Sequence, residues 1–170
     1  MESLEIGVIG TERLELVLLE VGHAEEMAVV MADPGLHVYI GGSPDTAEGL
    51  RARYERMVAG SPDPKVLWGN WVIRSRELAC LVGTVQTTVN LGEGEAVAEV
   101  AWVVGTPWQR QGIAVEAARG LVGWLREWGA SAVIAHVHPD HMASAAVAAA
   151  VGMTPTEHRH DGEVRWLLGF

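Results

Sequence analysis

Cysteine is almost absent from this sequence, since Cys80 is the only one among 170 residues. A single thiol can neither close an intrachain disulfide nor form a thiolate cluster for zinc. Long apolar runs are missing too: the longest weakly polar stretch, residues 142–153, is alanine-rich and too short to cross a bilayer. Residues 1–5 lack a basic start followed by an apolar segment, so we expect no secretory signal. These absences predict a soluble, cytoplasmic protein with no membrane partner.

Positive charge is scarce, because 12 Lys and Arg residues face 22 Asp and Glu residues, for a net charge of -10. Nucleic-acid binders gain most of their affinity from neutralising phosphates, so we expect no nucleic-acid partner. An acidic field attracts cations, and a protonated amine is one such partner. The same charge could also serve solubility alone.

Internal repeats, low-complexity tracts and long linkers are also missing, so we expect a single domain over residues 1–170. Apolar periodicity and turn residues predict a mixed sheet with helices on its faces, in the order β-α-α-β-β-β-α-β-α-β-β. The strands are expected at residues 11–21, 68–74, 78–89, 95–104, 131–137, 154–158 and 164–170. The helices are expected at residues 22–31, 47–59, 112–128 and 141–151.

The most informative segment runs from strand to turn to helix over residues 97–128. No acidic residue occurs between Val100 and Val115, although the chain carries 22 of them. The start of a helix exposes unpaired N–H groups that bind phosphate well. At this start, Gly112 lets phosphate oxygens approach the main chain, Ala114 keeps the approach open, and Arg110 can add a charge-assisted contact. A tight turn before a core helix would show the same features, so both interpretations stay open.

The run Gln109-x-x-Gly112-x-Ala114 resembles the coenzyme A signature of the GNAT N-acetyltransferases. Residues 11–14, 98–104, 112–117 and 141–144, with the glycine at 152, resemble the branch that contains the ribosomal-protein N-terminal acetyltransferases. The resemblance implies a GNAT fold of the α/β (α+β) class. Its central sheet is expected to be mixed and mostly antiparallel, with six or seven strands, one splayed parallel pair and about four flanking helices.

The resemblance further implies acetyl-CoA as co-substrate, with its pantetheine arm in the wedge between the splayed strands. A main-chain N–H near Val103 would polarise the thioester carbonyl. His141 stands where the family often has a coenzyme-contacting Asn, and imidazole can still donate a hydrogen bond. The residues expected to hold the coenzyme are Trp102, Val103, Val104, Gln109, Arg110, Gln111, Gly112, Ile113, Ala114, His141 and Ser144.

Many family members carry a tyrosine, as acid for the departing thiolate, one helical turn before the glycine that matches Gly152. Ala148 occupies that position in this chain. Ser144 remains as the candidate acid, because the ribosomal branch resembles this sequence at that serine. A free thiol has a pKa of about 8.5, so protonating the thiolate is a small demand. A purely structural role for the Ser144 hydroxyl at the start of its helix stays open.

The amine must be neutral to attack, and this costs about 4.6 kcal/mol at pH 7 for a lysine-like amine but only about 1 kcal/mol for a peptide N-terminus. Glu99 is the candidate base, because it interrupts an apolar strand and the related branch often has an acid there facing the acceptor. An ordered water or His138 could serve instead, and Glu99 could be an outward-facing strand residue.

The acceptor side is expected to be lined by His37, Tyr39, Trp71, Glu99 and His138, with residues 37–43 as a flexible lid. His136, His138 and His141 are close in sequence, but the family offers no precedent for a metal there, so we expect none.

The resemblance therefore predicts an N-acetyltransferase in which a primary amine, from a protein N-terminus or a small molecule, attacks acetyl-CoA directly in a ternary complex. The alternative is a catalytically weak sensor or scaffold that binds acyl-CoA, which the replaced Asn and Tyr positions favour. A homodimer is a further expectation, because relatives often pair through C-terminal strands.

Overall fold

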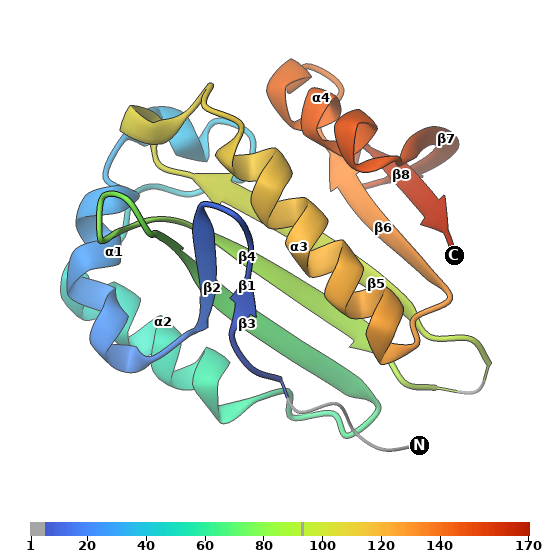
Figure 1. The fold of residues 1–170 in the computed structure, drawn as a ribbon, viewed down its shortest axis with the longest axis horizontal. Helices are drawn as coiled ribbons and strands as arrows, with labels where there is room; N and C mark the ends of the chain where they lie inside the picture. The colour runs from blue at the N-terminus through green and yellow to red at the C-terminus, as the bar shows by residue number, and fades with distance from the viewer. Residues whose placement is uncertain (1–5, 93) are drawn as a thin grey trace.

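The computed structural model describes residues 6–92 and 94–170. Residues 1–5, on which the expectation of no secretory signal depends, lie outside the described residues. The described residues form one eight-stranded sheet in the order β1-β2-β3-β4-β5-β6-β8-β7 (Figure 1). The strands are β1 (Ile9–Gly10), β2 (Leu14–Leu18), β3 (Val66–Ser75), β4 (Cys80–Asn90), β5 (Val97–Val104), β6 (Ala132–Val137), β7 (Thr154–His160) and β8 (Glu163–Gly169). The α-helices are α1 (Ala24–Val30), α2 (Ala47–Ala59), α3 (Ile113–Trp128) and α4 (Met142–Val151), and short 3-10 turns are η1 (Val21–His23), η2 (Pro34–His37) and η3 (Thr106–Trp108).

Alternation along β3 assigns the two faces of the sheet. Trp71 and Ile73 belong to the large apolar cluster under α3, whereas Val72 between them belongs to a second cluster with α1 and α2. Successive side chains of a strand point to opposite faces, so α3 covers one face and α1 with α2 covers the other. Figure 1 shows α3 lying across the sheet, with α1 and α2 at the end that carries β2 and β3.

The strongest helix, α3, owes its position to one apolar stripe. Ile113, Ala117, Leu121 and Leu125 recur at helical spacing and are all buried. Glycines bound the helix, because Gly112 and Gly129 both adopt the left-handed backbone conformation. The expected helix therefore forms almost residue for residue, and it brings its N-terminus to the ends of the central strands.

β5 and β6 are the one parallel pair in the described sheet, and they separate halfway. Their register covers only Val97–Glu99 against Ala132–Ile134. Beyond Glu99 the two strands diverge, while β6 continues to pair with β8 as far as Val137. The predicted mixed, mostly antiparallel sheet with a splayed parallel pair is confirmed. One edge of β5, toward Val104, is thus left without a partner strand.

The strand count and several ends differ from the sequence prediction. The sheet has eight strands, not six or seven, because β1 adds two residues beside Leu16 and Glu15. A two-residue strand has no periodicity to detect, and its pairing follows from the turn at Thr11, whose N–H bonds the Leu14 carbonyl. The first expected strand, 11–21, shrinks to β2, and the expected helix 22–31 divides into η1 and α1.

None of the helices within the described residues has both the length and the apolar character that spanning a bilayer requires.

Candidate active site

A cavity with a volume of about 1540 Å³ opens where β5 and β6 separate. Its walls come from β3, β4 and β5, the start of α3, the end of β6 and the start of α4. The segment before α2, residues 34–46, closes another side, and we call it the acceptor loop. The residues at the two splayed strands and those at the helix start therefore face one common space.

Residues 109–114, the coenzyme turn, lead into α3 with unusual backbone geometry. Arg110 has a φ of 61° and Gly112 a φ of 76°, both in the left-handed region. A non-glycine residue in this conformation costs energy that the surrounding structure must supply, and such residues concentrate at functional sites. No side chain within the described residues caps α3 at Gly112. The first N–H groups of α3 are thus free of a side-chain cap and can receive an anion.

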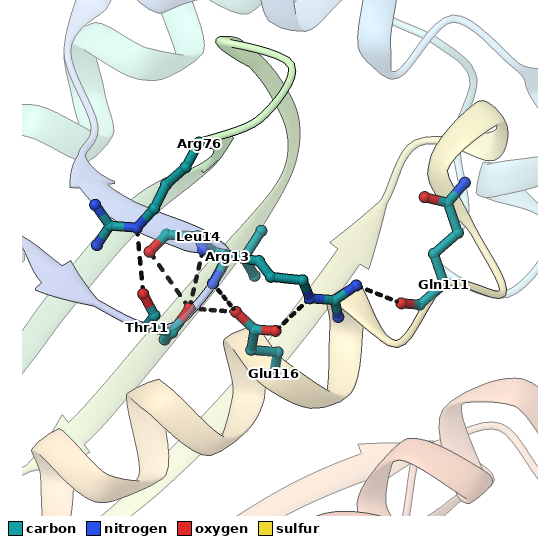
Figure 2. Close-up of polar contacts among 6 residues, drawn as sticks. All are labelled: Thr11, Arg13, Leu14, Arg76, Gln111 and Glu116. Atoms are coloured by element: carbon teal, nitrogen blue, oxygen red, sulfur yellow. Dashed lines mark hydrogen bonds and ion pairs between the residues drawn. The ribbon is translucent and has the colours of Figure 1, made fainter.

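An ion-pair network fixes this turn from behind (Figure 2). Arg13 Nε lies 2.7 Å from Glu116 Oε1, and another guanidinium nitrogen of Arg13 donates to the Gln111 carbonyl over 2.9 Å. Thr11 Oγ1 donates to the second oxygen of Glu116 over 2.5 Å, and Arg76 Nε donates to the Thr11 carbonyl over 3.2 Å. Partial burial acts to raise the pKa of Glu116, but the hydrogen bonds from Thr11 and Arg13 hold that pKa below its usual range. The network ties β2 to α3 and to the coenzyme turn.

Most of the residues expected to hold the coenzyme border the cavity. They are Trp102, Val103, Val104, Gln109, Arg110, Gly112, Ile113, Ala114, His141 and Ser144. Gln109 also donates from its side chain to the Val104 carbonyl over 3.0 Å, which joins the turn to the end of β5. Gln111 is the exception: its side chain turns toward the Pro107 carbonyl, 3.5 Å away, and it does not border the cavity.

The acceptor loop reaches across the cavity through one aromatic ring. Tyr39 stacks on His141 with centroids 4.4 Å apart, and its ring lies 5.0 Å from that of His138. The Tyr39 hydroxyl donates to the Asp140 carbonyl over 3.3 Å. Burial, followed by the neighbouring His138, lowers the pKa of His141, so the stacked ring is neutral at pH 7. His37 also borders the cavity, with its Nε2 3.5 Å from the Met31 carbonyl.

The candidate acid and bases have defined hydrogen-bond partners. Ser144 Oγ lies 3.4 Å from Nε2 of His141. His138 Nδ1 accepts the N–H of Asp140 over 3.0 Å, so the lone pair of a neutral ring is occupied. Glu99 has a half-exposed side chain, and its Oε1 lies 2.9 Å from Nδ1 of His136. Glu99, which was expected on the acceptor side, does not itself border the cavity, whereas its partner His136 does.

Trp71 was expected on the acceptor side, but the structure places its ring in the core. Although the residue borders the cavity, its side chain is fully buried. The indole N–H donates to the Gly7 carbonyl over 2.9 Å, and the ring meets Trp124 of α3 edge-on at 5.5 Å. Alternation along β3 turns Trp71 toward α3, away from the acceptor loop. We therefore correct this expectation and assign Trp71 to packing.

Sequence reasoning missed the partners of Glu99. His136 was considered only as a metal ligand, and Arg165 was not considered at all. In the described part of the chain, no group of three or more His, Cys, Asp or Glu side chains converges as a metal site would. His136 instead lies between Glu99 and Arg165, whose Nε is 3.0 Å from His136 Nε2. Alternation along β6 could have placed His136 on the Glu99 face, but the neighbour on its other side depends on sheet order.

A sequence model of the family described as "Acetyltransferase (GNAT) domain" matches residues 13–154. No curated protein matches the chain at a significant level.

Solved structures match over nearly the whole chain. An acetyltransferase of the GNAT family from Bacillus anthracis has a TM-score of 0.76 at 22% identity, over 95% of this chain and 98% of that one. The ribosomal-protein-S5-alanine acetyltransferase of Vibrio fischeri has a TM-score of 0.75 at 15% identity, over 95% and 96%. RimL, a ribosomal L7/L12 alpha-N-protein acetyltransferase solved with coenzyme A, has a TM-score of 0.74 at 15% identity, over 95% and 97%. These likenesses concern the fold. With a family match that covers most of its length, the chain belongs to the GNAT acetyltransferases.

Proposed function

We propose that this chain transfers the acetyl group of acetyl-CoA to a primary amine by direct attack in a ternary complex. The observation that carries the proposal is the start of α3, where free N–H groups follow the left-handed Arg110 and Gly112 beside the gap between β5 and β6. A diphosphate needs such main-chain donors, and the absence of acidic side chains between Val100 and Val115 removes repulsion. The coenzyme A bound to RimL, a structural neighbour, supports the same choice of ligand.

The residues present fit a coenzyme in two places. The amides of Gly112, Ile113 and Ala114 would hold the diphosphate, with Arg110 beside them. The unpaired edge of β5 from Trp102 to Val104 would pair with the amides of the pantetheine arm, as a strand edge pairs with an added strand. At Gly112 the φ is positive and a Cβ atom would lie 3.3 Å from a guanidinium nitrogen of Arg13, so glycine suits both the turn and the network behind it.

Glu99 is the base in this proposal. Its carboxylate takes a proton from the ammonium form of the acceptor, and the neutral nitrogen then attacks the thioester carbon. The carbon–sulfur bond breaks and the thiolate of coenzyme A leaves. The newly bonded nitrogen loses its second proton, which neutralises the thiolate by way of Ser144, so the products are an amide and free coenzyme A. Glu99 passes its proton to solvent, which it can do because its side chain is half exposed. Geometry favours Glu99 over His138, whose ring nitrogen is already occupied.

Ser144 is our candidate for stabilising and protonating the departing thiolate. It borders the cavity from α4 and has His141 Nε2 within 3.4 Å. The acceptor would enter between Tyr39, His37 and His138, and it is either a protein N-terminus or a small-molecule amine. The names of the two ribosomal-protein acetyltransferases among the neighbours support the first of these.

A second candidate function is coenzyme binding without turnover, as a sensor or scaffold. The position of Ala148 favours it, because this residue is fully buried and offers no hydroxyl where many relatives place the acid. A thiol-release assay against peptide N-termini, polyamines and amino sugars separates the two functions. Release of free coenzyme A that depends on an amine supports transfer, and binding without release supports the sensor.

Coenzyme binding is tested by thermal shift with acetyl-CoA. Saturating ligand at about 100 times its Kd should add about 2.7 kcal/mol of stability. Gly112→Glu should abolish the shift, because a side chain strains this left-handed position and disturbs the first amides of α3, and the new carboxylate adds negative charge beside them. Gly123→Glu is the matched control, since Gly123 lies on the exposed side of α3 with nothing within 4 Å of a Cβ.

A second variant separates lost binding from backbone strain at Gly112. Arg110 is already a non-glycine residue with positive φ, so Arg110→Glu reverses the charge without a new steric conflict. We expect a smaller shift for this variant at an unchanged apo melting temperature. A full shift in both variants would contradict the proposal.

A further inference from the structure

Three side chains from three neighbouring strands form a hydrogen-bonded row whose middle member borders the cavity. Glu99 of β5 lies 2.9 Å from His136 of β6, and His136 lies 3.0 Å from Arg165 of β8. The middle member is well enclosed, since only 7% of the His136 side chain is exposed. On its other side the ring stacks on that of His160 at 4.8 Å. Sheet order creates this row, because β8 lies next to β6 with Arg165 paired to His136.

The chemistry of the two outer members determines where the proton of His136 resides. The Arg165 guanidinium has only N–H donors, so its Nε donates and His136 Nε2 must accept. A neutral ring with an accepting Nε2 carries its proton on Nδ1. That proton points at Glu99 Oε1, which accepts it. The tautomer of His136 is therefore set by Arg165, and no lone pair of the ring remains for an acceptor amine.

We infer that His136 is a positioning residue that holds the Glu99 carboxylate for proton abstraction, with Arg165 fixing the tautomer. This inference rests on the proposed function, because it assigns work to the proposed base. With Oε1 occupied by His136, Glu99 Oε2 remains to receive the proton of the acceptor. The N–H bond of the ammonium group breaks and an O–H bond forms on Glu99, while His136 and Arg165 keep their protons throughout.

Kinetics of His136 variants test this inference. His136→Phe keeps the ring volume but removes both hydrogen-bonding nitrogens, and loss of such an orienting partner typically costs about 10–100-fold. We expect kcat to fall by about that factor while KM for acetyl-CoA is unchanged. His136→Asn restores a donor close to the Nδ1 position, so it should recover most of the lost kcat. His158→Phe is the matched control, an exposed histidine on β7 that should leave kcat unchanged.

A double-mutant cycle separates positioning from a general structural role. If His136 acts through Glu99, adding His136→Phe to Glu99→Gln should reduce kcat by less than about 2-fold beyond Glu99→Gln alone. If the double variant instead loses kcat by the product of the two single-variant factors, the inference is overturned, because His136 then acts independently of the base. Full activity of Glu99→Gln would also overturn it and would leave acetyl transfer itself standing. Failure of the wild type to release coenzyme A with any amine would instead contradict the proposed function.

The tautomer gives a readout that needs no turnover. In ¹⁵N-labelled protein at pH 8, the His136 ring should be neutral and protonated at Nδ1, and Arg165→Gln should weaken this preference. The ring ¹⁵N signals of His136 are identified as those that are missing from the spectrum of His136→Asn. A ring protonated at Nε2 in the wild type would overturn the inference whatever the kinetics show.

Discussion

The coenzyme turn and the acceptor loop border the same cavity but are attached to the fold in different ways. The turn is held by Arg13 and Glu116, which join β2 to α3, and by the Gln109 side chain on the Val104 carbonyl. The acceptor loop reaches the opposite wall of the cavity through Tyr39, which stacks on His141 and donates to the Asp140 carbonyl. Val38 and Ile40, on either side of Tyr39, are largely exposed. The next two residues, Gly41 and Gly42, have positive φ and open space around them.

This difference matches what each region has to recognise. Coenzyme A presents the same diphosphate in every reaction, so a rigid set of main-chain donors serves it well. Acceptor amines differ in shape, and a loop that reaches across the cavity through one ring can adapt or be replaced with little effect on the core. In our proposal the coenzyme half of the site is built mainly from backbone, whereas the acceptor half combines this loop with side chains of β5 and β6.

Breaking the network behind the coenzyme turn should have the largest effect. Glu116→Ala leaves Arg13 and Thr11 without their acceptor, and hydrogen bonds to a charged group contribute about 1.5–3 kcal/mol each. We expect the free energy of unfolding in urea to fall by about 2–3 kcal/mol and the acetyl-CoA thermal shift to shrink. Glu127→Ala, an exposed acid on the same helix, should change stability by less than about 0.5 kcal/mol. Equal effects of the two variants would remove the basis for calling this turn rigid.

The same network predicts a pH dependence with a definite sign. The folded pKa of Glu116 lies below the ordinary value of 4.5 for a glutamate, so its contribution to stability is fully present above that pH. As the pH falls through the lowered folded value, the carboxylate is protonated and the contribution is lost. Urea unfolding of wild type and Glu116→Gln should therefore differ by a constant amount from pH 6 to 8, and the difference should shrink below about pH 4. A difference that grows at low pH would contradict the assignment.

Sequence patterns predicted the elements around the coenzyme turn because their signals are local. The glycine at 112 and the apolar stripe of α3 lie within one segment, and the helix formed at Ile113–Trp128 as expected. The helix at Ala47–Ala59 formed with the expected ends, since Thr46 caps it and a glycine follows it. The residues within each segment were enough to predict both helices.

The acceptor half depended on neighbours that are far apart in sequence. His136 meets Arg165 only because β8, and not β7, pairs with β6. Trp71 was placed on the wrong side because a strand pattern shows that faces alternate without showing which face meets α3. The role of Arg13 was hidden in the same way, since Glu116 lies 103 residues further along the chain.

Removing the Tyr39 ring, which carries the acceptor loop across the cavity, should have the smallest effect on the fold and the most selective effect on function. Stacked aromatic pairs contribute about 0.5–1.5 kcal/mol, so Tyr39→Ala should raise KM for the acceptor by about 2–12-fold. The acetyl-CoA thermal shift should stay within error, because the coenzyme turn is held elsewhere. Tyr39→Phe keeps the stack on His141 and loses only the bond to the Asp140 carbonyl, so it should resemble the wild type. If Tyr39→Ala instead weakens acetyl-CoA binding as much as acceptor binding, the stacked His141 belongs to the coenzyme half, and the two regions cannot be varied separately.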